Sequence, residues 1–271
     1  MIRPAHHTDL PALRELFTRA NDAPYELAGV VEEKCFGAGI AGAPSTRVFE
    51  VDGAIKGAAV TCGKWLRILA VDRDARRRGI GTALLGDESV IFAEPGNYFT
   101  PGVLASDEET KAFFRARGFI ETQTTWNLEV DLDHLERRAL SPSDSLDGLR
   151  ARRSRSDEVL AFVEREFGRI WRFEAAKAFD TDPPTAFVDE NLTGFSVHDV
   201  NNRGLGFFGP TGVEKSARGK GIGCRLLLAS LADLRRLGYA KAVIPWTDAL
   251  DFYRKCCGAK PAHQFVTMQK V

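Results

Sequence analysis

The sequence predicts an α/β protein made of two tandem domains. Its 271 residues exceed what one ordinary core requires, and 44% of them are hydrophobic, which is enough to bury a core in each of two domains. A basic, glycine-containing segment occurs twice, about half a chain apart, in equivalent surroundings. An offset of that size indicates duplicated domains and not a solenoid repeat. Strand-like and helix-like patterns alternate in the same order around both copies.

Both halves are expected to contain the same elements. Short apolar or alternating runs predict the strands, and apolar residues three or four apart predict the helices. The expected elements are a first strand (2–4 and 149–152), a helix with an acidic N-terminus (9–17 and 157–167), a β-hairpin (48–60, turning at Asp52-Gly53, and 187–197, turning near Asn191), a strand before the repeated loop (65–71 and 205–213), a helix after it (225–237 in the second half, with Gly238 as its C-cap), a further strand (97–103 and 241–246), a short helix (107–117 and 249–257) and a closing β-segment (121–132 and 264–270). This order gives domains at residues 1–137 and 149–271, separated by a Ser-, Pro- and Asp-rich linker at 138–148.

The repeated segment joins a strand to a helix through a loop that suits an anion. It reads VDRDARRRGIG at residues 71–81 and VEKSARGKGIG at residues 213–223. The glycines let the backbone approach a ligand closely and expose its N–H groups, and the helix that follows directs the positive end of its dipole to the same point. Arginine and lysine side chains add positive charge. Neither copy has the Gly-Lys-Ser/Thr of a P-loop or the third glycine of a dinucleotide-binding loop.

The order Arg-x-x-Gly-x-Gly in both copies resembles the acetyl-CoA signature of the Gcn5-related N-acetyltransferases (GNAT). The resemblance covers both halves, most firmly residues 66–119 and 205–259. It implies two tandem GNAT domains, each with a central mixed, mostly antiparallel sheet flanked by helices. In each sheet two central parallel strands would splay apart to seat the pantetheine arm of acetyl-CoA, the co-substrate. The coenzyme would contact Val71, Arg76, Arg77, Arg78, Gly79, Ile80 and Gly81 in the first half, and Val213, Arg218, Gly219, Lys220, Gly221, Ile222 and Gly223 in the second.

The same resemblance places catalysis in the second half. Family members frequently use a tyrosine on the short late helix to protonate the departing thiolate. Tyr253, in Phe-Tyr-Arg-Lys-Cys-Cys-Gly, matches that pattern with one extra residue before the glycine, whereas the first half has Phe114 at the equivalent position. Phenylalanine has no proton to give. Tyr253 is therefore predicted to be the general acid, and a packing role for its ring is the alternative.

The general base is specified less clearly than the general acid. Glu214 follows the strand that leads into the second loop, and Asp199 lies on the preceding hairpin, so these two carboxylates are the candidates that we single out. Surface carboxylates are also common without any catalytic role. Other residues of suitable chemistry nearby in the sequence are Glu190, Asp248, His198 and His263.

The composition limits the expected partners. Lys plus Arg and Asp plus Glu both number 37, so the net charge provides no attraction to nucleic acid. No apolar run is long enough to span a membrane, the start of the chain lacks a signal-peptide pattern, and the five cysteines show no metal-ligand spacing. We therefore expect a cytoplasmic protein with no nucleic-acid partner, no membrane partner and no metal.

These features together predict an N-acetyltransferase that moves an acetyl group from acetyl-CoA to a primary amine of a small molecule or peptide, by direct attack in a ternary complex. The alternative is a non-catalytic acyl-CoA-binding protein with a regulatory or scaffold role. A third hypothesis is chromatin-type protein acetylation, for which no accessory recognition segment is visible.

Overall fold

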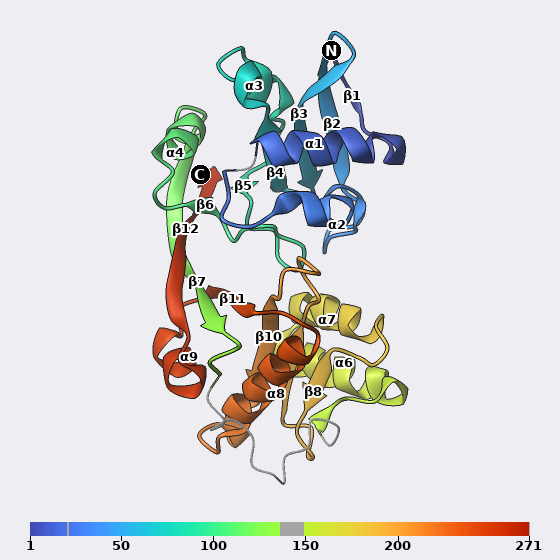
Figure 1. Cartoon of the computed structure of the whole chain (residues 1–271), viewed down its shortest axis with the longest axis vertical. Helices are drawn as coiled ribbons and strands as arrows, with labels where there is room; N and C mark the ends of the chain where they lie inside the picture. The colour runs from blue at the N-terminus through green and yellow to red at the C-terminus, as the bar shows by residue number, and fades with distance from the viewer. Residues whose placement is uncertain (21, 136–148, 271) are drawn as a thin grey trace. The chain divides into compact units, whose positions relative to one another are not determined.

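The structure, a computed structural model, describes residues 1–20, 22–135 and 149–270 and divides into two compact units (Figure 1). The first unit contains Met1–Thr125 together with the C-terminal segment from His263, and the second contains Trp126–Ala262. The units therefore differ from the predicted domains in two segments. Residues from Trp126 onward in the first predicted domain belong to the second unit, and residues from His263 onward in the second predicted domain belong to the first unit. The predicted linker at 138–148 lies outside the described residues.

The first unit is a mixed sheet with helices packed against it. In chain order its elements are β1 (Ile2–Pro4), α1 (Leu10–Ala20), α2 (Val31–Phe36), β2 (Ser45–Val51), β3 (Ala54–Cys62), β4 (Trp65–Val71), α3 (Ile80–Leu84), β5 (Val90–Ile91), β6 (Val103–Leu104), α4 (Glu108–Arg115) and the start of β7 (Phe119–Asp131). Strands β1 to β4 pair antiparallel, and helix α1 packs on β3 and β4. The hairpin between β2 and β3 turns at Asp52 and Gly53, whose φ values of 49° and 77° suit a two-residue turn.

The central strands β4 and β5 are parallel and separate soon after they meet. They pair at Trp65 with Val90 and at Leu66 with Ile91. Strand β5 ends there, while β4 runs on to Val71 without it. The predicted fold class, a mostly antiparallel sheet flanked by helices with splayed central parallel strands, is confirmed in this unit.

The strand expected at 97–103 is wrong, because most of this segment is a loop between β5 and β6. Buried polar side chains hold the loop in place. The Asn97 side-chain amide donates to the carbonyl oxygens of Gly37 at 3.2 Å and Ala38 at 3.1 Å. The loop thus satisfies carbonyl groups beyond the end of α2, which a strand at this position would leave without those donors.

The second unit repeats this plan with a separate three-stranded sheet, counted over its described residues. Its elements are the end of β7, α6 (Ser156–Phe167), α7 (Arg169–Ala176), β8 (Ala186–Val188), β9 (Gly194–His198), β10 (Phe208–Val213), α8 (Ile222–Arg236), β11 (Lys241–Thr247), α9 (Leu250–Cys257) and the start of β12 (Lys260–Lys270). Strands β8, β9 and β10 pair antiparallel, and helix α8 packs across them. A parallel bridge joins Phe207 to Val243, after which β10 and β11 diverge in the same way as β4 and β5.

The first strand expected at 149–152 is reduced to one antiparallel bridge, between Arg150 and Phe187, in the described part of this segment. Side-chain contacts anchor it instead of a strand ladder. The Arg150 guanidinium donates to both carboxylate oxygens of Asp233 on α8, at 2.9 and 2.6 Å. Asp233 also accepts from His198 at 3.0 Å, so the segment is fixed to the sheet and to the long helix together.

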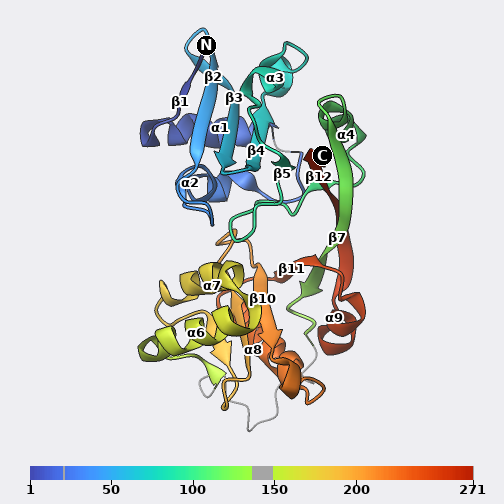
Figure 2. The same ribbon diagram turned by 180° about the vertical axis from the view of Figure 1, so that it is seen from behind.

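Two long strands are shared between the units. Strand β12 lies between β5 and β7 in the sheet order, and the two long strands β7 and β12 run side by side in both views (Figures 1 and 2). Met268 of β12 pairs with Ile91, and Phe265 pairs with Leu104, so the C-terminal strand completes the first unit's sheet. In return, β7 pairs antiparallel with β11 of the second unit. None of the helices in the described ranges is both long and apolar enough to cross a membrane.

Candidate functional site

The two repeated loops have the same backbone conformation. Gly79 and Gly221 immediately precede helices α3 and α8, and their φ values of 80° and 79° lie in the left-handed region. A Cβ added at either glycine would meet no atom within 4 Å, so the space over each loop is open. Each helix therefore starts at an uncovered turn, as an anion site at a helix N-terminus requires.

The second glycine of each loop allows the late helix to approach closely. A Cβ on Gly81 would lie 3.3 Å from the Phe113 ring of α4. A Cβ on Gly223 would lie 3.4 Å from Val213 and 3.6 Å from the Phe252 ring of α9. The two halves thus share side-chain packing as well as sequence, and Phe113 and Phe252 are equivalent positions.

The packing also involves two glycines that the sequence analysis missed. A Cβ on Gly57 of β3 would lie 2.7 Å from Ile80, and one on Gly194 of β9 would lie 2.9 Å from Ile222. Both glycines let the first residue of the helix rest directly on the neighbouring strand. The signal was a glycine inside each predicted hairpin, which often marks close backbone approach.

The signature arginines serve the loop itself. Nε of Arg76 donates to the carbonyl oxygen of Val71 at 3.2 Å, and Nε of Arg218 donates to that of Val213 at 3.0 Å. Each guanidinium therefore ties its loop to the last residue of the preceding strand. The sequence predicted these arginines to contact the coenzyme, which stays a prediction; in the structure their Nε atoms hold the loop to the preceding strand.

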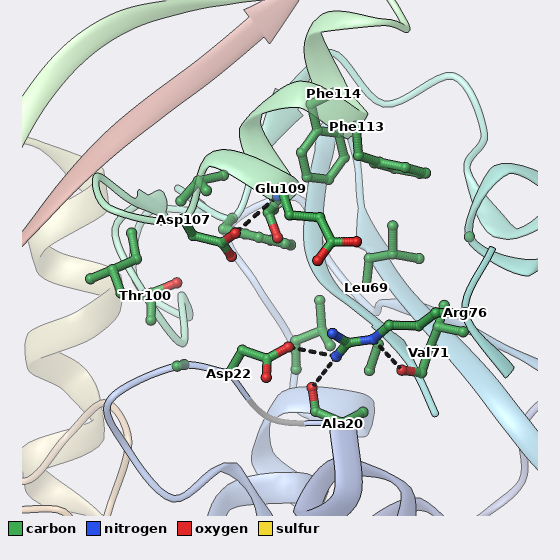
Figure 3. A pocket seen from close by; sticks show the side chains of 18 of the residues that line it. Ala20, Asp22, Leu69, Val71, Arg76, Thr100, Asp107, Glu109, Phe113 and Phe114 are labelled. Atoms are coloured by element: carbon green, nitrogen blue, oxygen red, sulfur yellow. Dashed lines mark hydrogen bonds and ion pairs between the residues drawn. The ribbon is translucent and has the colours of Figure 1, made fainter. Parts of the chain in front are cut away.

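Carboxylates pair with three of the four arginines of the first loop, and Figure 3 shows the pair between Asp22 and Arg76. Asp22 accepts from Arg73 at 2.7 Å and from Arg76 at 2.5 Å, and Arg76 also donates to the carbonyl oxygen of Ala20 at 3.2 Å. Glu109, from the first turn of α4, lies 3.8 Å from Arg77. The two arginines hold the pKa of Asp22 below its ordinary value, against the opposing effect of burial, so this carboxylate is ionised at neutral pH.

The second loop keeps its positive charge. Lys215, Arg218 and Lys220 are exposed, and in the part of the chain that the structure describes none of them has a carboxylate within 4.0 Å. The helix behind this loop, α8, has 15 residues, whereas α3 behind the first loop has 5. More peptide dipoles are therefore aligned behind the second loop than behind the first.

A cavity of about 950 Å³ lies beside the first loop. It occupies the space where β4 continues without β5, and Leu69, Phe99, Phe113 and Phe265 supply much of its apolar wall. Arg67 also lines the cavity, is buried and pairs with Glu94 at 2.5 and 2.9 Å. Its guanidinium also donates to the carbonyl oxygens of Lys34 and Gly37, both at 2.8 Å, so the charge is paired and hydrogen-bonded.

Tyr253 lies on α9 with its ring in the core of the second unit. The residue is 8% exposed, and its ring makes edge-to-face contacts with Phe208 of β10 and Phe252, at centroid distances of 6.3 and 5.0 Å. Within the described residues the Tyr253 hydroxyl has no hydrogen-bond partner. The hydroxyl oxygen is not fully buried, because it is not among the fully buried polar atoms that lack a partner. Burial raises the pKa of Tyr253, so the hydroxyl keeps its proton well above neutral pH.

Phe114, the counterpart of Tyr253, is a core residue of the first unit. It is 1% exposed and packs edge-to-face with Phe92, Phe113 and Phe119 at centroid distances between 5.1 and 5.8 Å. The first unit therefore presents an aromatic ring without a proton donor at this position.

The base candidates lie in different surroundings. Glu214 follows β10 directly, and its carboxylate accepts from the Ser216 hydroxyl at 2.5 Å. In the pair of strands β9 and β10, Gly194 lies opposite Val213 at the loop end, and His198 lies opposite Phe208 at the other end. Asp199 follows His198, so it lies at the end of β10 that is far from the loop. Its carboxylate accepts from the Tyr239 hydroxyl at 3.0 Å and from the Gly204 amide at 2.8 Å, so it stabilises its own loop.

The remaining candidates have mostly structural contacts. His198 is fully buried and bonded to Asp233, and His263 packs edge-to-face on Tyr25 at 5.8 Å. Glu190 and Asp248 are exposed. Over the described ranges, no group of three or more His, Cys, Asp or Glu side chains is placed to hold a metal ion.

Comparisons with known proteins agree with this geometry. The acetyltransferase (GNAT) family matches residues 151–259. A GCN5-related glucosamine N-acetyltransferase region of a fungal multi-domain GH3 β-N-acetylglucosaminidase shares 18% identity over 99% of this chain, with a TM-score of 0.75. This chain spans only 38% of that protein. No curated protein matches the sequence.

Two further structures match over nearly their whole length. A GCN5-related N-acetyltransferase from Sphaerobacter thermophilus shares 18% identity over 100% of this chain and 95% of its own, with a TM-score of 0.68. A tandem GNAT protein from the clavulanic acid biosynthesis pathway shares 19% identity over 99% of this chain and 97% of its own, with a TM-score of 0.63. Residues 151–259 therefore match the GNAT acetyltransferase family, and the chain as a whole has the fold of a tandem GNAT protein.

Proposed function

We propose that the protein is an N-acetyltransferase that transfers the acetyl group of acetyl-CoA to a primary amine of a small molecule or peptide, and that the second unit carries the reaction. The observation that supports this most is the second loop: an open left-handed turn at Gly221, a 15-residue helix behind it and basic side chains without carboxylate partners in the described residues. Such a loop binds the diphosphate of a coenzyme through backbone N–H groups and the helix dipole. Gly219 to Gly223 would line this site, with Val213 at the end of the strand.

The divergence of β10 and β11 provides a place for the coenzyme's arm. The strands are bridged at Phe207 and Val243 and then separate, so backbone groups near their ends are available to the pantetheine amides. The thioester would then lie between the strands, on the side where α9 packs on β10. A backbone N–H of β10 would polarise the thioester oxygen.

The chemical step is a direct attack. The neutral amine nitrogen bonds to the thioester carbonyl carbon, the carbon–sulfur bond breaks, and the amine loses one proton. Tyr253 would give its hydroxyl proton to the departing thiolate, and the coenzyme would leave as a free thiol. Glu214 is adjacent to the loop, and its carboxylate accepts from the Ser216 hydroxyl. We propose that Glu214 is the base, directly or through water. Asp199 fits this role less well because the Tyr239 hydroxyl and the Gly204 amide already engage its carboxylate.

The experiment is an amine screen with purified protein and acetyl-CoA, in which thiol release is measured with a disulfide reagent. Glucosamine is a rational first acceptor, because one structural neighbour is a glucosamine N-acetyltransferase region. Amino acids and peptides with a free N-terminal amine would be tested next. Amine-dependent thiol release supports the proposal. Coenzyme binding without thiol release for any amine would favour the second candidate, an acyl-CoA-binding protein without turnover. Phe114 of the first unit, a packed ring without a proton donor, also favours this candidate.

A further inference from the structure

The two loops differ in charge far more than in backbone. Both turn at a left-handed glycine, and both signature arginines bond the carbonyl oxygen of the preceding strand. In the first loop, however, Arg73 and Arg76 share Asp22, and Arg77 faces Glu109. Three of the four arginines of the first loop therefore pair with carboxylates of the same chain, whereas the fourth, Arg78, is exposed and has no carboxylate within 4.0 Å in the described residues.

The carboxylates belong to separate elements that enclose the loop. Asp22 follows the end of α1, and Arg76 is held there by the Ala20 carbonyl as well, at the negative end of that helix. Glu109 comes from α4, and its side chain points into the cavity beside Leu69 and Phe113 (Figure 3). A coenzyme that entered this cavity would bring its negative charge toward one or both carboxylates.

In the second unit Asp248 lies four residues before Phe252, as Glu109 lies before Phe113, but within the described residues no carboxylate is within 4.0 Å of Lys215, Arg218 or Lys220. Helix α6 ends at Phe167, whose ring lies 2.5 Å from the position of a Cβ on Gly212, one residue before the end of β10. An apolar ring therefore packs against the end of β10 just before the second loop. Arg218 keeps its bond to Val213 and remains exposed.

We infer that Asp22 and Glu109 close the first loop to the coenzyme's diphosphate, so that the chain binds one coenzyme molecule, at the second loop. The inference rests on the proposed function for the identity of the coenzyme. It makes Asp22 and Glu109 specificity-determining residues of a unit that retains its cavity. Because the exclusion is electrostatic, it acts on the diphosphate and leaves the uncharged pantetheine part of the coenzyme unaffected.

The test uses the full-length protein carrying Gly221→Glu, which removes binding at the second loop and isolates the first. Calorimetric titration of this variant with CoA should show no binding. Adding Asp22→Asn and Glu109→Gln should make CoA binding detectable, tighter at low salt than at high salt, and should leave the affinity for pantetheine unchanged. The matched control adds Asp87→Asn and Glu108→Gln, which remove two exposed carboxylates of the same unit that lie more than 4.0 Å from the loop arginines in the described residues.

Three results would overturn the inference. The Gly221→Glu protein would bind CoA at the first loop; the added substitutions would give no detectable CoA binding; or they would raise CoA and pantetheine affinity equally. Failure of the proposed function would look different, because the wild-type protein would then bind no CoA or would release no thiol with any amine. The circular dichroism spectrum of each variant establishes that it is folded.

Discussion

Replacing Tyr253 by phenylalanine removes one hydroxyl and keeps the ring that packs on Phe208 and Phe252. If Tyr253 protonates the leaving thiolate, kcat should fall by about 10²-fold, the usual scale for losing a positioned acid, which corresponds to roughly 2.7 kcal/mol of activation free energy. The unfolding free energy should change by less than about 0.5 kcal/mol, because the hydroxyl has no hydrogen-bond partner in the described residues and the buried ring supplies the packing. Coenzyme affinity should stay within about twofold of the wild type, since the loop residues are untouched.

Tyr239 of the same unit is the matched control. Its hydroxyl donates to Asp199 at 3.0 Å, so Tyr239→Phe should lower the unfolding free energy by about 1 kcal/mol and leave kcat unchanged. The assay is steady-state thiol release at saturating acetyl-CoA with the amine found by screening, together with urea unfolding of both variants. Full turnover by Tyr253→Phe would refute the assigned role and mean that water or the amine supplies the proton.

Three further variants address the second unit. Gly221→Glu places a side chain and a negative charge in the open turn, so coenzyme binding at the second loop should drop below detection in a titration while the thermal midpoint changes little. Gly194→Ala puts a methyl group 2.9 Å from the first residue of α8 and should lower the unfolding free energy by about 1–3 kcal/mol in urea. Burial opposes ionisation of Asp233, but hydrogen bonds from His198 and Arg150 outweigh it and hold its pKa below the ordinary value. The stability contributed by Asp233 is therefore present above about pH 4 and is lost as the pH falls further, so the melting-temperature difference between wild type and Asp233→Asn should be large at pH 7 and should shrink below pH 4.

The repeated loop could be predicted from the sequence because its determinants are local. A glycine that must adopt a positive φ, a strand that ends in valine and a helix that begins at isoleucine recur in both halves, and the structure places them alike at Gly79 and Gly221. The turn at Asp52-Gly53 is equally local. Each of these features depends on residues within one short segment.

The features that escaped prediction depend on residues far apart in the chain. The segment at 97–103 has the apolar residues of a strand, but its Asn97 is needed by carbonyl groups near the end of α2. Asp22 is about fifty residues from the arginines that it pairs with, and nothing near it in the sequence indicates that contact. The exchange of β7 and β12 between the units likewise follows from pairing between distant strands.

The placement of β12 has a consequence for the order in which the protein folds during synthesis. Phe265 and Met268 are buried in the first unit, yet the ribosome adds them after every other described strand. Domains usually fold in the order of their synthesis. Here the N-terminal unit must wait for the last strand to emerge, while the continuous segment Trp126–Ala262 has all of its own residues earlier. Until then the first unit exposes an open sheet edge and part of its core, the kind of surface that chaperones bind during translation.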